Sequence, residues 1–90
     1  MTNSKKQASI NFKKARSHIE KIISMLEDDE YCIDVMQQNL AVIGLLRGAH
    51  KTLMEGHLKG CFVEAVGSKS EKKKNEMIEE ILKVTRLYNK

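Results

Sequence analysis

The amino-acid sequence predicts an all-α fold, and three observations support this prediction. None of the 90 residues is proline, the residue that most strongly interrupts a helix. Apolar residues recur every three or four positions in the first and last parts of the chain, as in amphipathic helices. Between these parts, residues 30–66 read as one long helix. We therefore expect one small domain, residues 1–90, with three helices and a disordered start at residues 1–5.

The first predicted helix runs from about Ser4 or Lys6 to Glu27. One side of this helix is apolar, and its charged residues lie on the other side. The apolar side comprises Phe12, Ala15, Ile19, Ile22, Ile23 and Leu26. The acidic residues 27–30 then predict a turn, and their carboxylates suit the N-terminal end of the next helix, which carries a partial positive charge.

The long helix is predicted to end at a polar break, residues 67–70. Gly67 is a candidate C-cap there, and Ser68 or Ser70 is a candidate N-cap for the helix that follows. This third helix should run from about Glu71 to Leu87. Its apolar side comprises Met77, Ile78, Ile81, Leu82, Val84 and Leu87.

The long helix is expected to need a second copy of the chain. A 90-residue chain buries a limited core, and the long helix overhangs any hairpin that it forms with the first. Gly44 and Gly48 would let two helices approach closely, unless they are merely tolerated at a cost in helix stability. We predict a homodimer built as an antiparallel four-helix bundle, which can pair again as a dimer of dimers, a homotetramer. The exposed stripe of the long helix that would face the second copy comprises Val35, Asn39, Val42, Leu46 and Leu53.

The charge and the absence of long apolar stretches narrow the classes of partner. The formal net charge is +4, which favours a polyanion such as nucleic acid, although a lysine-rich solvated surface explains it equally well. No stretch approaches the roughly 20 apolar residues that span a membrane. The start of the chain has no apolar signal core, so we expect a cytoplasmic protein. In that compartment cysteines are typically thiols or metal ligands rather than disulfides.

Three soft or borderline metal ligands lie on the long helix: Cys32, His57 and Cys61. Their spacings, 25 and 4 residues, return the side chains to nearly one face at about 100° per residue. His57 and Cys61 are one turn apart, whereas Cys32 is about 37 Å away at about 1.5 Å per residue. Two antiparallel chains could complete the site, with Cys32 of one meeting His57 and Cys61 of the other at two identical places. The alternative is two buried thiols and a surface imidazole that bind no metal.

The donor set of two thiolates and one imidazole favours Cu(I), a soft ion that accepts low coordination numbers. Zn(II) prefers four tetrahedral ligands, so three would leave one position for water. We expect the methionines, Met77 among them, to be core residues rather than further copper ligands. His18 and His50 are not placed on the ligand stripe with equal precision and are expected to be surface or packing residues.

The segment YCIDVMQQNLAV, followed by HLKGC, resembles the copper-sensing operon repressor (CsoR) family of bacterial metal-responsive repressors. This resemblance implies an all-α tetramer, a dimer of dimers, that binds Cu(I) through Cys from one protomer and His plus Cys from the other. The family also includes sensors of nickel or cobalt, formaldehyde and persulfides. Retention of Cys32, His57 and Cys61 is similar to the copper sensors. By the same resemblance, Tyr31 would support the metal ligands, and Glu76 is the nearest candidate for a supporting Glu in the third helix.

Candidate phosphate contacts lie on the first two helices, which would be adjacent in the bundle. Such contacts supply affinity and salt dependence but do not select a sequence. The candidates are Lys13, Lys14, Arg16, Arg47 and Lys51. The run at residues 72–74, three lysines, is expected to be a solvated helix start instead. The alternative reading is that all these charges only cover outer faces.

The chain also departs from the pattern of the family. Asn11 stands where relatives tend to carry Arg, and Gly48 occupies a basic position of the long helix, with Arg47 beside it. The usual G-Q-x-x-G segment reads Ser17-His18-Ile19-Glu20-Lys21 here. These departures bear on how an operator would be recognised.

The sequence as a whole predicts a Cu(I)-responsive transcriptional repressor. It would bind operator double-stranded DNA in the apo form and release it when Cu(I) binds. One alternative is a sensor of the same fold for another metal or a thiol-reactive species. A second is a copper-binding helical bundle that does not bind DNA. No Gly-rich phosphate loop or Ser/His/Asp arrangement indicates an enzyme.

Overall fold

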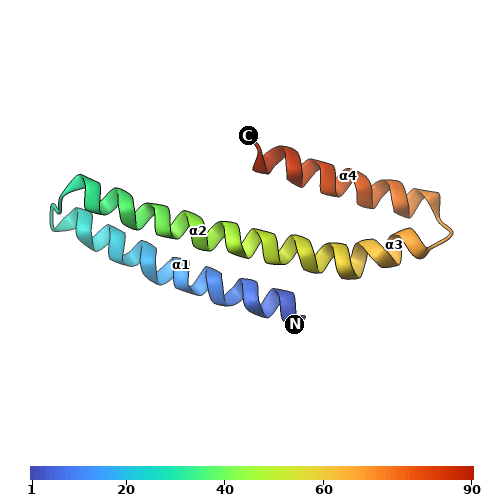
Figure 1. Cartoon of the computed structure of the whole chain (residues 1–90), viewed down its shortest axis with the longest axis horizontal. Coiled ribbons are helices and arrows are strands. Elements are labelled where there is room, and N and C mark those ends of the chain that lie inside the picture. The colour runs from blue at the N-terminus through green and yellow to red at the C-terminus, as the bar shows by residue number, and fades with distance from the viewer. The chain divides into compact units, whose positions relative to one another are not determined.

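The computed structural model describes all 90 residues, and all of its regular elements are helices (Figure 1). They are α1 (Asn3–Glu27), α2 (Cys32–His57), the π-helical segment η1 (Leu58–Phe62), α3 (Val63–Gly67) and α4 (Glu71–Tyr88). The all-α prediction is therefore confirmed. No helix combines the length and the apolar character needed to cross a membrane. The chain divides into two compact units, Met1–Glu55 and Gly56–Lys90, and the predicted single domain stays a prediction.

The first helix begins earlier than the sequence predicted. The Thr2 side chain accepts a hydrogen bond from the backbone N–H of Lys5, with 3.2 Å between Oγ1 and N. Such an N-cap satisfies one of the amides that a helix start leaves without a partner. Residues 3–5 are consequently helical, and the prediction that they are disordered was wrong.

The predicted acidic turn joins α1 to α2. The Asp28 amide still donates to the Ser24 carbonyl, at 3.0 Å, and the chain then reverses at Asp29, whose φ is 53°. Asp is one of the few residues besides glycine that enters this left-handed region readily. Tyr31 precedes the first turn of α2, which Cys32 opens and in which Asp34 provides a carboxylate.

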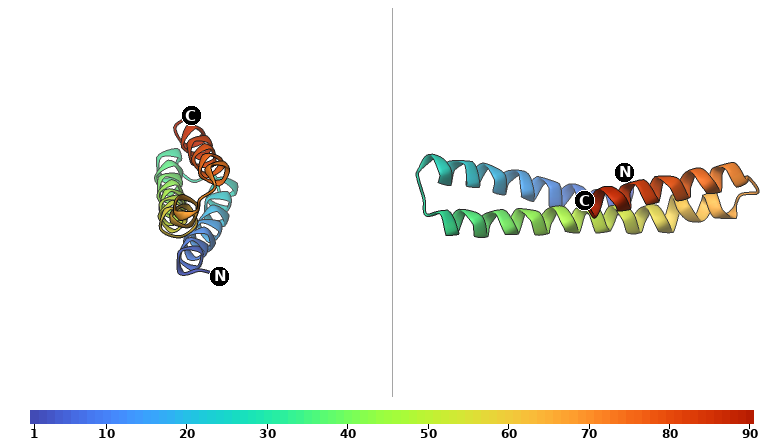
Figure 2. Two further views of the ribbon diagram at one scale, coloured as in Figure 1. Left: turned by 90° about the vertical axis from the view of Figure 1, so that its right-hand side faces the viewer. Right: turned by 90° about the horizontal axis from the view of Figure 1, so that it is seen from above.

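In the first unit, α1 lies antiparallel to α2 (Figures 1 and 2). The most deeply buried side chains of this unit are small, with Ala8 and Ala15 on α1 and Ala49 on α2. Short side chains at the contact allow two helix axes to approach closely. Met25 and Val42 complete the buried set.

Most of the apolar side predicted for α1 is exposed. Phe12, Ile19, Ile23 and Leu26 expose between 43% and 61% of their surface. Two helices can cover only a narrow stripe of each other, so the rest of a wide apolar face stays uncovered. This surface agrees with the expected need for a second copy, while the dimer and the tetramer themselves stay predictions.

The predicted long helix is interrupted by a π-helical turn. Helical φ and ψ angles persist on both sides, −65° and −44° at His57 and −61° and −42° at Val63. Residues 58–62 between them form the wider turn that π hydrogen bonding produces. The prediction of one uninterrupted α-helix over residues 30–66 was therefore wrong, because a widened turn rotates every later side chain relative to a regular α-helix.

The second unit ends in α4, which turns back against α3 (Figures 1 and 2). Ser70 caps α4, since its Oγ accepts from the Lys73 amide at 3.2 Å, as predicted. The candidate C-cap Gly67 has no positive φ, and Ser68 is the cap residue of α3 instead. Its hydroxyl donates to the Ala65 carbonyl at 2.7 Å, which serves the same end of the helix.

Candidate metal centre and nucleic-acid interface

Two of the three predicted metal ligands lie on one turn of the second unit. His57 is the last residue of α2, and Cys61 lies within η1, which follows directly. π-helical turns are frequently found at functional sites, where the widened turn redirects side chains that a regular helix would aim elsewhere. His57 is half-buried, whereas the Cys61 thiol is free and exposed. The imidazole is thus held by packing and the thiol remains accessible.

His57 makes a side-chain contact that the sequence did not predict. Its Nε2 atom lies 3.1 Å from Sδ of Met77, a half-buried residue of α4. A thioether sulfur is a weak hydrogen-bond acceptor and also a soft donor to metals. The twenty-residue separation between the two residues gave no signal of this contact, since it depends on how the chain reverses at residues 68–70.

Glu76, the candidate support for the metal ligands, is directed elsewhere. Its carboxylate lies 4.0 Å from the Lys72 ammonium one turn earlier on α4, and both side chains are largely exposed. The side chain beside His57 is Met77, one position later. Consecutive helical residues point about 100° apart, so Glu76 and Met77 face different directions, and Met77 is the one that lies beside His57.

Cys32 and Tyr31 belong to the first unit. Cys32 opens α2, and its thiol is free and exposed. Tyr31 directly before it exposes 70% of its surface, an unusual position for a phenol ring. No three His, Cys, Asp or Glu side chains of one chain are grouped to hold a metal ion. A three-ligand site would therefore draw on a second copy.

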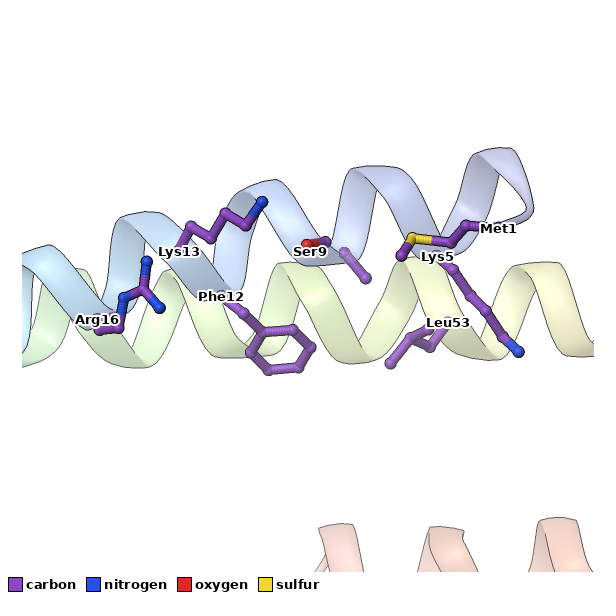
Figure 3. Close-up of a pocket in the computed structure, with 8 residues that line it drawn as sticks. Met1, Lys5, Ser9, Phe12, Lys13, Arg16 and Leu53 are labelled. Atoms are coloured by element: carbon purple, nitrogen blue, oxygen red, sulfur yellow. The ribbon is translucent and has the colours of Figure 1, made fainter.

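The candidate phosphate contacts are all exposed side chains of the first unit. Lys13 and Arg16 line an open groove of about 420 Å³ whose floor is apolar. Figure 3 shows Phe12 of α1 and Leu53 of α2 lying on the same side of the groove, with Arg16 towards one end and Lys5 towards the other. Lys5 was not predicted, because the chain start was expected to be disordered.

A second depression continues the cationic face of α1. Lys13 lines it together with Lys14 and Lys21, beside the uncharged Ser17. His18 also lines this depression, and its Nε2 lies 2.6 Å from Oε1 of Gln38 on α2. Of the two expected roles, surface or packing, His18 therefore has the packing role, since it is half-buried and contacts α2. The two concavities share Lys13, so this residue is central to the cationic surface.

Two departures from the family pattern are in contact with each other. Asn11 Nδ2 donates to the Leu45 carbonyl at 3.3 Å, which links α1 to α2. A Cβ atom added at Gly48 would lie 2.7 Å from the same Nδ2. Gly48 therefore leaves space for Asn11, and the two residues form one packing arrangement within the chain. An added Cβ at Gly44 would meet nothing, so of the two glycines Gly44 and Gly48 it is Gly44 that keeps an open surface.

Comparison with known proteins identifies the family. A family model described as "metal-sensitive transcriptional repressor" matches residues 4–86, nearly the whole chain. The chain belongs to this family. Its members are transcriptional repressors, which agrees with the prediction that the chain is not an enzyme.

Curated relatives in this family carry copper-related names. The copper-sensing transcriptional repressor CsoR of Mycobacterium ulcerans is 48% identical over 63 residues, 69% of this chain and 54% of that protein. The copper-sensing repressor RicR of Mycobacterium tuberculosis is 34% identical over 65 residues, 72% of this chain and 68% of that protein. CsoR of Bacillus subtilis is 28% identical over 86 residues, 96% of this chain and 82% of that protein. The chain spans about half the length of the mycobacterial CsoR proteins that it matches.

Proposed function

We propose that this chain is a cytoplasmic, Cu(I)-responsive transcriptional repressor that binds operator DNA in the apo form and releases it when Cu(I) binds. The observation that carries this proposal is the soft donor set, two free exposed thiols and an imidazole, in a chain of the metal-sensitive repressor family. Thiolate and imidazole donors in low coordination suit Cu(I). The relatives named as copper-sensing repressors support the same metal.

The metal site would be divided between two protomers. Cys32 of one protomer would hold Cu(I) together with His57 and Cys61 of another, in an antiparallel homodimer with two identical sites. Support comes from the helix itself, because Cys32 is the first residue of α2 and His57 is the last. The apolar surface that α1 leaves exposed favours assembly into the dimer and then into a homotetramer. When bound, the metal supplies a link between protomers.

The same chain would hold DNA through the first unit. Lys13, Lys14 and Arg16 on α1, with Arg47 and Lys51 on α2, would contact phosphate oxygens of operator double-stranded DNA. For Cu(I) to release the operator, it must favour a conformation with lower affinity for DNA, and the DNA must lower the affinity for Cu(I) by the same factor. Tyr31, next to the ligand Cys32, is a candidate to carry this coupling through a hydrogen bond.

Copper titration of the reduced protein, followed both by X-ray absorption and by operator binding, tests the proposal. We expect one Cu(I) per protomer, three-coordinate with two sulfur donors and one nitrogen, and loss of the DNA complex at the same stoichiometry. An all-nitrogen or oxygen-rich site would contradict the metal assignment. Release by a thiol-reactive reagent but not by Cu(I) would favour the alternative sensor, which the exposed thiols also permit. Copper binding without operator binding would favour a helical bundle that does not bind DNA.

A further inference from the structure

The proposed metal site leaves one soft donor of the first unit unused, the thioether of Met36 on α2. The methionines were expected to be core residues, but Met36 exposes 55% of its surface, so this expectation was wrong for Met36 within the chain. Met25 shows the usual alternative, since it exposes only 7% and belongs to the core of the first unit. Packing inside the chain therefore does not account for the sulfur atom of Met36.

Met36 lies one helical turn after Cys32. Both residues belong to the regular helix α2, and residues four apart on an α-helix are neighbours, with about 5–6 Å between their Cβ atoms. The Cys32 thiol is also free and exposed. Met36 lies about 120° round the helix from Val42, which is buried. The geometry thus places a thiol and a thioether side by side on an accessible part of α2.

We propose that Cys32 and Met36 form an entry site for Cu(I), at which an incoming copper complex gives up its ion before the ion reaches the three-ligand site. This inference rests on the proposed copper site and adds the residue at which the ion enters it. A thiolate and a thioether are both soft donors, and soft donors select Cu(I). Met36 donates during transfer and does not belong to the final set of Cys32, His57 and Cys61.

The transfer at this pair is an exchange of ligands without a change in oxidation state. Cys32 loses its proton to water as its sulfur binds the ion, because a thiol must be deprotonated to act as a ligand. The bond between the ion and a ligand of the incoming complex breaks, and that ligand keeps its electron pair. The Met36 sulfur carries no proton, so it binds and leaves without a proton transfer. It therefore holds the ion beside Cys32 while the other ligands exchange.

The rate of copper uptake tests this role. The donor is the coloured complex of Cu(I) with bicinchoninate, mixed anaerobically with the reduced protein, and the loss of its colour is followed by stopped flow. Met36→Leu keeps the volume and removes the sulfur, so uptake should slow by about tenfold, a loss of about 1.4 kcal/mol of transition-state stabilisation. The equilibrium affinity for Cu(I) should not change. Uptake by Met36→Leu at the wild-type rate would overturn the proposal, and so would a sulfur neighbour lost from its final copper site in X-ray absorption.

Leu40 offers a matched control, because it is exposed on the same helix but lies two turns from Cys32. A thioether at residue 40 would be about 12 Å along the helix from residue 32, too far to share an ion with that thiol. The variant Met36→Leu/Leu40→Met keeps the composition of the chain and should stay as slow as Met36→Leu. Leu40→Met alone should take up copper at the wild-type rate. Recovery of the rate in the double variant would overturn the pairing with Cys32.

NMR of protein labelled with ¹³C in its methionine methyl groups observes the thioether directly. The variant His57→Ala/Cys61→Ala lacks two of the three proposed ligands but keeps the entry pair. Less than one equivalent of Cu(I) should shift the Met36 methyl signal and leave that of the buried Met25 in place. The Met36 signal is assigned by its absence in Met36→Leu, and circular dichroism confirms that the variants are folded. A Met36 signal that does not move while copper binds would overturn the entry site.

These measurements separate failure of the entry site from failure of the proposed function, because neither involves DNA. A wild-type protein that takes up Cu(I) but keeps its operator contradicts the proposed function, whereas the uptake rate and the methyl shift still decide the role of Met36. Conversely, a Met36→Leu protein that takes up Cu(I) at the wild-type rate and releases its operator normally contradicts the entry site alone.

Discussion

The two units of the chain are stabilised in different ways. In Met1–Glu55, five apolar side chains are buried, and hydrogen bonds of the Asn11 and His18 side chains link α1 to α2. In Gly56–Lys90 only Ala65 is buried, and Ile78 and Leu82 on α4 each expose 43% of their surface. The first unit is a packed hairpin with cations on its outside. The second consists of a widened helical turn and a helix whose apolar side is largely uncovered.

This difference suits the division of function that we propose. Regions with few buried contacts open and rearrange at lower free-energy cost than packed ones. The unit with the smaller core carries His57 and Cys61, so the free-energy cost of a structural change on metal binding would be low there. The packed unit carries the candidate phosphate contacts and can present them in a fixed arrangement. Substitutions of the candidate metal ligands, of the cationic side chains and of the packed residues of the first unit test this difference between the two units.

The largest expected effect is on Cu(I) binding and follows from the proposed division of the metal site between two chains. Cys32→Ala and Cys61→Ala homodimers should each lose the high-affinity Cu(I) site, because each lacks one of two thiolates. Unfolding and refolding the two variants together should create mixed dimers in which one of two sites is complete. With random pairing, half the dimers are mixed, so up to about a quarter of the wild-type sites should return. The measurement is a competitive Cu(I) titration.

The matched control for this experiment is refolding of each variant alone, which should restore no tight sites. Mass spectrometry of the native assemblies confirms that mixed dimers are present. If mixed dimers form without any return of tight sites, Cys32 does not act across the protomer interface. The first unit would then contribute nothing to the metal centre of its partner.

The fold could be predicted from the sequence because its helices are specified locally. Apolar spacing, the acidic residues 27–30 and the cap at Ser70 each act within a few residues, and the elements that they predicted are present. The start of α1 was missed because the polar composition of residues 1–5 indicated disorder, whereas the N-cap hydrogen bond of Thr2 starts the helix at Asn3. The π-helical turn η1 was missed because its five residues follow the same apolar pattern as an α-helix.

The candidate site could be predicted only in part, for a related reason. Cys32, His57 and Cys61 stand out by their chemistry and spacing, and the structure leaves both thiols free. The contact between His57 and Met77 depends on how α4 packs within the second unit; apolar periodicity placed Met77 on the apolar side of its helix but did not identify His57 as its neighbour. Likewise, Asn11 and Gly48 read as two separate departures until the structure placed one against the other.

Charge removal on α1 is expected to have the second-largest effect and tests whether the first unit is the DNA surface. Lys13→Ala should weaken operator binding, because Lys13 lines both cationic concavities. Each phosphate contact that is lost should reduce the slope of log K against log salt concentration by about one. Lys14→Ala and Arg47→Ala should behave in the same way. The measurement is operator binding by fluorescence anisotropy across a range of salt concentrations.

Lys73→Ala provides the matched control, since it removes the same charge from the second unit. We expect its salt slope to equal that of the wild type. If Lys73→Ala lowers the slope and the α1 and α2 variants do not, the DNA surface lies on the second unit. The DNA-binding role that we propose for the first unit would then belong to the second unit.

The smallest expected effect concerns the close packing of the first unit at Asn11 and Gly48. Gly48→Ala should gain about 1 kcal/mol from helix propensity. However, the new Cβ would lie 2.7 Å from Asn11 Nδ2 and displace it from the Leu45 carbonyl, a hydrogen bond worth about 1 kcal/mol. The two terms roughly cancel, so Gly48→Ala alone should change the free energy of unfolding little. In an Asn11→Ala background nothing is left to displace, and the same substitution should stabilise the protein by its full propensity gain.

Urea unfolding of the two single variants and the double variant measures this coupling, which we expect to be about 1 kcal/mol. Gly44→Ala is the control, since its Cβ would meet no atom of the chain and its effect should be the same with or without Asn11. Additive effects at Asn11 and Gly48 would show that the two residues are independent departures from the family pattern. A coupling of the expected size would show that Asn11 and Gly48 depend on each other, because the missing side chain at Gly48 leaves the space that the Asn11 amide occupies.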